Sequence, residues 1–438
     1  MLEKIKQILD NHQEIKSWSI SHQKTDGTQQ YDIGKTREAI RQVSTECYKV
    51  DVLCDSLDGE GKSSCGVGTV TLLPGDEIQE MIEQAVLTAK LVHNQPFDFP
   101  DPGELPKVEL ADSVYLKDPK GALDNTISTI MEISSLIPGV RISAAECFGQ
   151  ERQTHLLSSK GIDANQNDTE IYIQWVVIAG KGEDEVESFA EIYSRRLADL
   201  NLDEEVKRRA QYTADLLKTE TAPSRTGPVI VRGGTLAGML AGEVYFGSMI
   251  QLLSSAENKY TGETPWKIGK SIFREEVKGD PLHVFANRQL PYGMNSSVFD
   301  SEGIPAQRVS LIQDNQLKTF IASQRFAHYL NLPVTGDFGN LEMSAGSTPT
   351  ADLVADSHIE IADFSWFNPN PITGDFASEI RLGYLVENGE RKPFRGGLLI
   401  GNLLDALADV TWSSEIGFYS NYLGPSAARF NNLQVAGE

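Results

Sequence analysis

The hydrophobic pattern of this chain changes at one short segment. The stretch TETAPSRTGP begins at residue 219, and its Pro, Gly, Ser and Thr content is typical of a domain junction near residues 219–227. Helix-like and strand-like patterns alternate before it, whereas extended runs that meet at tight turns dominate after it. Because 438 residues exceed what one hydrophobic core usually serves, we expect two domains, residues 1–222 and 223–438.

The first half mixes both kinds of secondary structure. Amphipathic spacing predicts helices over 78–93, 121–137 and 203–218. The runs YKVDVLCDS, GVGTVTLL, RISAAECF and EIYIQWVVIAG are typical of strands. We therefore expect an α/β N-terminal domain.

The sequence pattern of the second half predicts β-hairpins. In 307–323 and 379–400, two extended runs meet at Asp314–Asn315 and at Asn388–Gly389. Further helices are expected to begin near Gly234 and near Asn402. The fold class is therefore α+β, with a mostly antiparallel, barrel-like C-terminal domain.

Charge limits the possible partners. The chain has 39 basic and 62 acidic residues, a formal net charge of -23, which repels the phosphate backbone of nucleic acid. No apolar run approaches the roughly 18 residues of a membrane span. The opening places Leu2, Ile5 and Leu9 on one helical face, unlike the continuous apolar centre of a signal peptide. We expect a cytoplasmic protein that binds neither nucleic acid nor membrane.

The stretch GGTLAGMLAGEVYFGSMI, residues 233–250, raises three possibilities for one helix. A dinucleotide fingerprint needs glycine at its third position, where Thr235 stands. A helical zinc site needs histidines one turn apart, and this stretch has none. The favoured interpretation is close packing, since Gly234, Gly238 and Gly242 recur every four residues and leave one face bare for another backbone.

Several polar residues are candidates for a peptide cleft, each with a simpler explanation. Thr373, Gly374 and Asp375 either line a cleft or form a turn in which Asp375 caps amides. Asn402 is expected to cap a helix rather than contact substrate. Arg381, like Arg395, either pairs with acids or binds a peptide carboxylate.

Two further groups are expected to be structural. Asp300 and Glu302 precede a Gly-Ile-Pro turn and are expected in a solvated loop rather than as a catalytic carboxylate pair. The aromatic residues of the C-terminal half are expected in the core or at a dimer interface; these are Trp366, Phe367, Trp412, Phe418, Tyr419 and Tyr422.

Four segments of the second half together resemble one family. They are FDSEGIPAQRVSLIQDNQLKTFIAS (299–323), the stretch 368–390 that contains GDFASEIRLGYLVENGE, RGGLLIGNLLDAL (395–407) and the closing NYLGPSAARFNNLQVAGE. The chain is similar in these segments to the TldD/PmbA family, also called TldD/TldE and often labelled modulators of DNA gyrase. The resemblance is looser before about residue 226.

The resemblance implies a specific functional division. TldD members are metallopeptidases in which an HExxxH helix and a late Cys hold the metal, whereas TldE or PmbA members lack these ligands and work with TldD. The helix should correspond to residues 234–250, where Gly238, Gly242, Glu243 and Gly247 stand, and no Cys follows Cys147. The resemblance therefore predicts a PmbA-like chain with no metal, no cofactor and no catalytic residue of its own.

The leading hypothesis is a subunit that pairs with a TldD-type metallopeptidase, or with itself, and supports processing of peptides. One alternative is an independent peptide-binding or scaffolding protein. Another is a stand-alone hydrolase that uses carboxylates.

Overall fold

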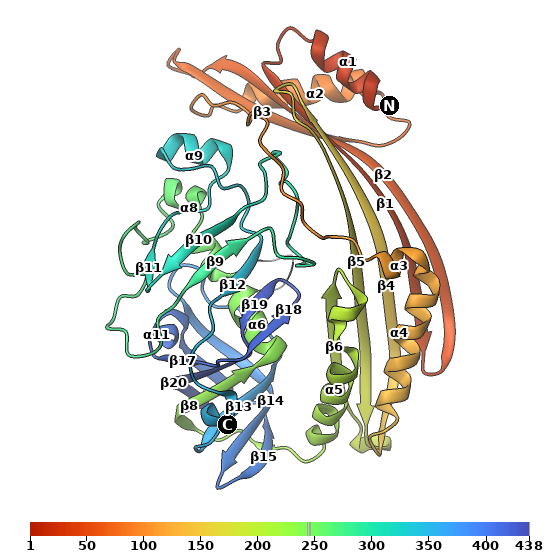
Figure 1. Cartoon of the computed structure of the whole chain (residues 1–438), viewed down its shortest axis with the longest axis vertical. Coiled ribbons are helices and arrows are strands. Elements are labelled where there is room, and N and C mark those ends of the chain that lie inside the picture. Colours follow the sequence, from red (N-terminus) through yellow and green to blue (C-terminus); the bar gives the residue numbers. More distant parts are fainter. Residues whose placement is uncertain (243, 245–246, 438) are drawn as a thin grey trace.

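The computed structural model of the chain describes residues 1–242, 244 and 247–437. A long curved sheet in the N-terminal half arches over the two sheets of the C-terminal half (Figure 1). No helix among these residues is long and apolar enough to cross a bilayer. The fold class is the predicted α+β.

The N-terminal sheet is antiparallel and has six strands in the order β3-β2-β1-β4-β5-β6. The strands are β1 (Ser17–Ile33), β2 (Thr36–Leu57), β3 (Ser63–Leu72), β4 (Val140–Ser158), β5 (Asp163–Ala179) and β6 (Val186–Ser194). The four predicted strand segments all lie in this sheet.

The helices of the N-terminal half cover one face of this sheet. They are α1 (Leu2–Asn11), α2 (Ile78–Leu91), α3 (Ser113–Lys117), α4 (Pro119–Ser134) and α5 (Leu202–Leu216). In β5, Ile171, Ile173 and Trp175 are at most 1% exposed and pack against α4 and α5. Because side chains alternate along a strand, Tyr172 and Gln174 point to the opposite face, which we call the inner face. The helices predicted over 78–93, 121–137 and 203–218 are confirmed, with ends shifted by at most three residues.

The C-terminal half contains a barrel. Its strands follow the order β13-β8-β20-β16-β14, and β14 pairs in turn with β13, which closes the ring. They are β8 (Arg225–Arg232), β13 (His358–Phe364), β14 (Asp375–Glu387), β16 (Leu398–Asn402) and β20 (Ala427–Ala436). Outside the ring, β15 (Glu390–Arg395) and β7 (Glu220–Thr221) extend β14, and β17 (Val410–Trp412) pairs with β20. The pairings of the ring are antiparallel except β8–β13, so the barrel-like prediction is confirmed.

A second six-stranded sheet packs beside the barrel in the order β11-β10-β9-β12-β19-β18. The strands are β9 (Val284–Asn287), β10 (Arg308–Gln313), β11 (Gln316–Leu317), β12 (Asn340–Met343), β18 (Ile416–Tyr419) and β19 (Tyr422–Pro425). Both predicted hairpins are present. Their turn residues have positive φ, 50° and 62° at Asp314 and Asn315 and 51° and 81° at Asn388 and Gly389, the conformation that suits the twist of a two-residue hairpin.

Short helices complete this half: α6 (Gly233–Ala241), α7 (Met249–Leu253), α8 (Ala256–Thr261), α9 (Gln324–Leu330), α10 (Thr350–Leu353) and α11 (Leu403–Ala408). The Asn402 Oδ1 atom accepts hydrogen bonds from the amides of Leu404 and Asp405 at 3.0 and 3.3 Å, so its predicted capping role is confirmed. Trp412 and Tyr422 are core residues, whereas Trp366 is 66% exposed.

The single helix predicted over 234–250 is wrong. Helix α6 ends at Ala241, and Gly242 follows with φ of 71°, a conformation that favours glycine. A new helix, α7, begins at Met249, where the Ser248 hydroxyl caps it by accepting from the Gln251 amide. Glu243 lies outside the described residues. The domain boundary at residue 222 stays a prediction.

Candidate functional site

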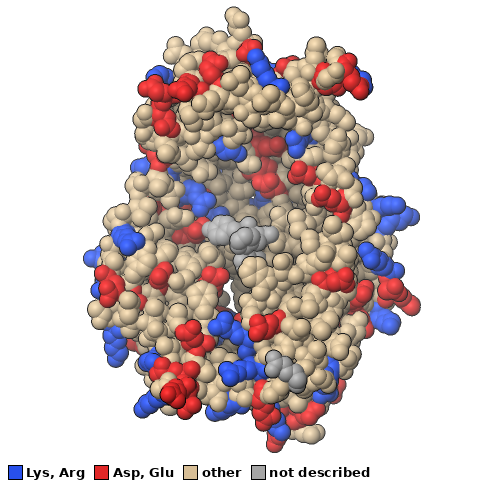
Figure 2. Space-filling view, turned by 180° about the vertical axis from the view of Figure 1, so that it is seen from behind, with Lys and Arg blue, Asp and Glu red and all other residues tan. Residues whose placement is uncertain are grey.

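A cavity of about 250 Å³ lies where the two halves meet, beside α6. We call it the α6 cavity. The N-terminal half contributes residues from β6, from the 3-10 turn Leu197–Leu200 and from α5, and the C-terminal half contributes α6 and the β18–β19 hairpin. Figure 2 shows the surface hollowed between the two halves. Its described lining is Glu191, Ile192, Tyr193, Asp199, Leu200, Asn201, Glu205, Arg208, Gly234, Ala237, Gly238, Gly242, Val244, Phe418, Tyr419, Ser420 and Asn421.

The Gly234 and Gly238 positions of α6 border this cavity, so within this chain the close-packing prediction holds only at Gly242, where an added Cβ would come within 2.2 Å of the Gly247 carbonyl oxygen. Among the described residues, a Cβ atom placed on Gly238 would meet no atom within 4 Å, and one on Gly234 would come no closer than 3.9 Å to the Arg208 guanidinium. The opposite face of α6 is the packed one, since Leu236 and Leu240 are at most 1% exposed in the C-terminal core. Gly234 and Gly238 therefore widen the cavity, whereas Gly242 admits the backbone of Gly247.

A fixed positive charge faces the glycines. The Arg208 guanidinium forms an ion pair with Glu205 and lies 5.7 Å from the centre of the Tyr212 ring. Burial by itself would lower the pKa of Arg208, but the Glu205 carboxylate and Tyr212 outweigh it and the pKa is raised. Burial also raises the pKa of the neighbouring Tyr419, which therefore stays a neutral hydroxyl near neutral pH.

The residues around α6 do not fit a metal ion. Its glycine face carries no donor side chain, and Glu205 is already paired with a permanent cation. Across the described part of the chain, no group of three or more His, Cys, Asp or Glu side chains is placed to hold a metal.

The structure brings most of the predicted cleft residues together at another place. The Thr373 hydroxyl donates to one Asp375 oxygen at 2.8 Å, and the Asn402 amide donates to the other at 2.8 Å and to the Thr373 carbonyl at 2.7 Å. Gly374 completes this turn with φ of 86°, and hydrogen bonds from Asn402 and Thr373 lower the pKa of Asp375. Arg381 lies further along β14. These residues do not line the α6 cavity, and their contact with a peptide stays a prediction.

The predicted solvated loop at Asp300 and Glu302 is wrong. Asp300 is 8% exposed, and its carboxylate accepts from the amides of Glu302, Ile304 and Asp337 at 3.0, 2.9 and 3.2 Å. The Arg288 guanidinium lies 3.5 Å away. Segments remote in sequence cover this loop, which a local pattern cannot reveal.

Burial changes the titration of both acids. It raises the pKa of Asp300 to about 6, against the pull of Arg288, and the pKa of Glu302 to about 7. Glu302 also lines a second cavity, of about 320 Å³, between the N-terminal sheet and α9. Because both pKa values lie near neutrality, we expect this contact between the halves to respond to pH.

Replacing Glu302 by glutamine is expected to stabilise the protein at about pH 8 and to change little at about pH 4. The folded-state pKa of about 7 lies above the ordinary value of 4.5, so the native carboxylate costs free energy that grows as the pH rises from about 4.5 to about 7 and is fully present above it. We expect a gain on the order of 2 kcal/mol after allowing for partial solvent screening. Denaturant unfolding at both pH values measures it.

Glu302→Ala is the matched control. It also removes the charge, but it leaves the Gln324 amide, which donates to Glu302 Oε2 at 2.9 Å, without its acceptor. Its gain at high pH should therefore be smaller than that of Glu302→Gln. An equal destabilisation by Glu302→Gln at both pH values would contradict the raised pKa.

Comparison with known protein families gives a match in the C-terminal half of the chain. Residues 225–437 match the family described as the PmbA/TldA metallopeptidase C-terminal domain. The C-terminal half of this chain belongs to the PmbA/TldD family. The resemblance seen in the sequence is thereby confirmed. The PmbA/TldD domain begins with β8 and includes the barrel, α6 and the β18–β19 hairpin of the cavity.

Relatives extend the likeness beyond that domain. An uncharacterized protein of Methanocaldococcus jannaschii is 24% identical over 62% of this chain and 64% of its own length. A metalloprotease of Synechocystis is 23% identical over 90% of this chain and 89% of its own length.

Two solved structures share the whole fold. One, described as a modulator of a DNA gyrase from Thermotoga maritima, has a TM-score of 0.82 at 20% identity and covers 100% of both chains. TldE from Thermococcus kodakarensis has a TM-score of 0.81 at 18% identity and covers 99% of this chain and 98% of its own. At such identities the likeness shows the fold alone.

Proposed function

We propose that this chain is a metal-free, TldE-like subunit that supports the processing of peptides by a TldD-type metallopeptidase. The observation that carries the proposal is the α6 cavity: the helix expected to present metal ligands presents glycines and faces the Arg208 guanidinium. The cavity can hold part of a polypeptide, and its described lining brings together no group of three His, Cys, Asp or Glu side chains placed to hold a metal that would activate water. Catalysis would then take place on the partner, with a homodimer as the other assembly to be considered.

The cavity has the chemistry of a binding surface. It combines the half-buried Arg208 guanidinium and the neutral Tyr419 hydroxyl with the bare backbone of α6. Such a lining can orient a peptide carboxylate or carbonyl while the glycines leave room for its side chains. The turn formed by Thr373, Gly374, Asp375 and Asn402, together with Arg381, is retained as a proposed second peptide contact.

The test mixes this chain with an HExxxH-bearing relative from the same genome and follows cleavage of an unstructured peptide. We expect a complex on size-exclusion chromatography and cleavage only in the mixture. Gly238→Leu should fill the cavity and reduce the rate about tenfold without preventing complex formation, as a misplaced substrate typically costs at least that factor.

Gly59→Ala provides the control, because a Cβ atom there would meet nothing within 4 Å. A complex that forms with no change in cleavage would favour an independent scaffolding role. Absence of both complex and activity, or cleavage by this chain alone with bound zinc, would contradict the proposal.

A further inference from the structure

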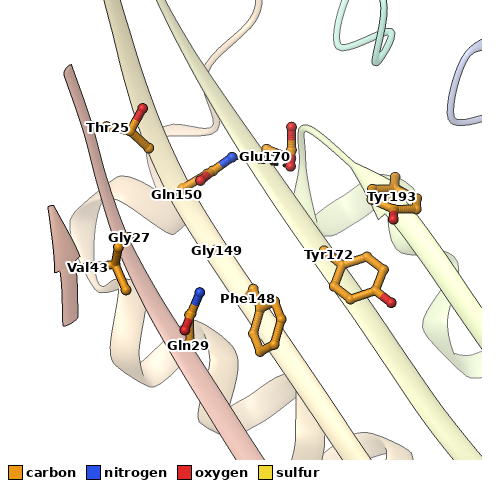
Figure 3. Close-up of a pocket in the computed structure, with 10 residues that line it drawn as sticks. All are labelled: Thr25, Gly27, Gln29, Val43, Phe148, Gly149, Gln150, Glu170, Tyr172 and Tyr193. Atoms are coloured by element: carbon orange, nitrogen blue, oxygen red, sulfur yellow. Dashed lines mark hydrogen bonds between the residues drawn. The ribbon is translucent and has the colours of Figure 1, made fainter. Parts of the chain in front are cut away.

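A row of aromatic rings crosses the inner face of the N-terminal sheet. We call it the aromatic row: Tyr31 on β1, Phe148 on β4, Tyr172 on β5 and Tyr193 on β6. Successive ring centres are 5.1, 5.6 and 4.7 Å apart. Tyr172 is the direct cross-strand partner of both Phe148 and Tyr193. The rings thus form one continuous surface, three of whose members appear in Figure 3.

A pocket lies beside this row because one strand lacks a side chain there. Along β1, Gly27 stands between Thr25 and Gln29 on the same face, and Figure 3 shows the gap that it leaves. The pocket has a volume of about 270 Å³, with Gln150 and Glu170 on its other side. A Cβ atom on Gly27 would come within 3.3 Å of Gln150 Cβ, so even alanine would narrow it.

The aromatic row leads toward the α6 cavity. Tyr193 lines both the pocket and that cavity. The same face contacts the C-terminal half nearby, since Gln166 accepts from the Val298 amide at 2.8 Å. An extended chain therefore fits this recessed face better than a folded domain does.

The electrostatics of the row favour a cation. Glu146, Glu170 and Glu191 act on Tyr172 or lie beside the pocket. Arg152 offsets one of them, through its ion pair with Glu170 at 3.1 Å. Figure 2 shows acidic side chains in the upper part of the hollow, with basic side chains beside them.

One ring of the row already contacts an arginine of the protein itself. At the far end of the row, the Arg41 guanidinium lies over the Tyr31 ring, 4.8 Å from its centre. A planar guanidinium can stack on an aromatic face and also donate to carboxylates, whereas an ammonium ion is a compact, strongly hydrated charge.

We propose that the aromatic row binds arginine side chains of an extended polypeptide that leads into the α6 cavity. This inference rests on the proposed peptide-handling function and adds a substrate class to it: unstructured peptides rich in arginine. The rings stack on the guanidinium, the carboxylates attract its positive charge, and the pocket beside Gly27 has room for the side chain.

The test measures binding by this chain alone, using fluorescein-labelled Gly/Ser peptides that differ only in carrying arginine, lysine or neutral citrulline. We expect fluorescence anisotropy to show the arginine peptide binding about tenfold more tightly than the citrulline peptide, and the lysine peptide in between. The preference should weaken at high salt because the contacts are partly exposed.

Tyr172→Leu is expected to weaken arginine binding about fivefold, as lost cation–π contacts would, with little effect on the citrulline peptide. Gly27→Val should act in the same direction without removing a ring. Trp366→Leu is the matched control, because Trp366 is an exposed aromatic residue outside the row. Circular dichroism checks that each variant is folded.

Equal affinity for the arginine and citrulline peptides would overturn the inference, as would equal losses in Tyr172→Leu and Trp366→Leu. Neither result would test whether the chain forms a complex with a metallopeptidase partner. Conversely, selective arginine binding without any such complex would support the binding role of the aromatic row and contradict the proposed function.

Discussion

Replacing Arg195 by alanine is expected to lower the free energy of unfolding by about 3–5 kcal/mol, because it leaves a buried charge without its partner. The Arg195 side chain is 7% exposed and lies 2.8 Å from the Asp168 carboxylate, which is 1% exposed. The same guanidinium donates to the Gly293, Met294 and Ser296 carbonyls at 2.9 to 3.1 Å. It therefore joins β5 and β6 to the C-terminal half, and its loss should loosen the contact between the halves as well as destabilise the protein.

The neighbouring Arg196 is the control. Its side chain is 40% exposed and its ion pair with Asp199 is only partly buried, so Arg196→Ala should cost about 1 kcal/mol. Urea unfolding gives both values, and limited proteolysis between the halves reports their separation. Similar losses for the two variants would show that Arg195 does not hold the halves together.

Gly68→Ala is expected to destabilise the N-terminal half by about 3 kcal/mol through overpacking. Gly68 lies on β3 directly under α2, and an added Cβ would come within 1.8 Å of the Ala85 carbonyl oxygen. A Cβ atom added to Gly66 would likewise collide with the Ala89 carbonyl oxygen. Because the obstacle is backbone rather than a flexible side chain, α2 must move away from the sheet.

Gly59→Ala, in the adjacent β2–β3 connection, should be nearly neutral, since a Cβ there meets no atom within 4 Å. Thermal unfolding of both variants followed by circular dichroism makes the comparison. A Gly68→Ala variant as stable as wild type would mean that α2 can shift without losing its buried contacts.

The sequence determined the local features of this protein. Helical periodicity placed α2, α4 and α5, because an amphipathic stripe depends only on residue spacing. The turn residues at 314–315 and 388–389 placed both hairpins, because positive φ is a local requirement. The capping role of Asn402 was predicted for the same reason. The absence of histidine from residues 234–250 already spoke against a zinc helix.

Only the tertiary structure decided what the glycines of α6, the acids Asp300 and Glu302 and the inner-face aromatics do. A glycine every fourth residue leaves one face of a helix without side chains. Whether a backbone or a cavity lies opposite that face depends on where α5 and β6 pack. The Asp-x-Glu loop is buried by distant segments, and the aromatic row arises from strand register across β1, β4, β5 and β6. Long-range burial and register place residues together that are far apart in the chain, so residue spacing alone does not encode them.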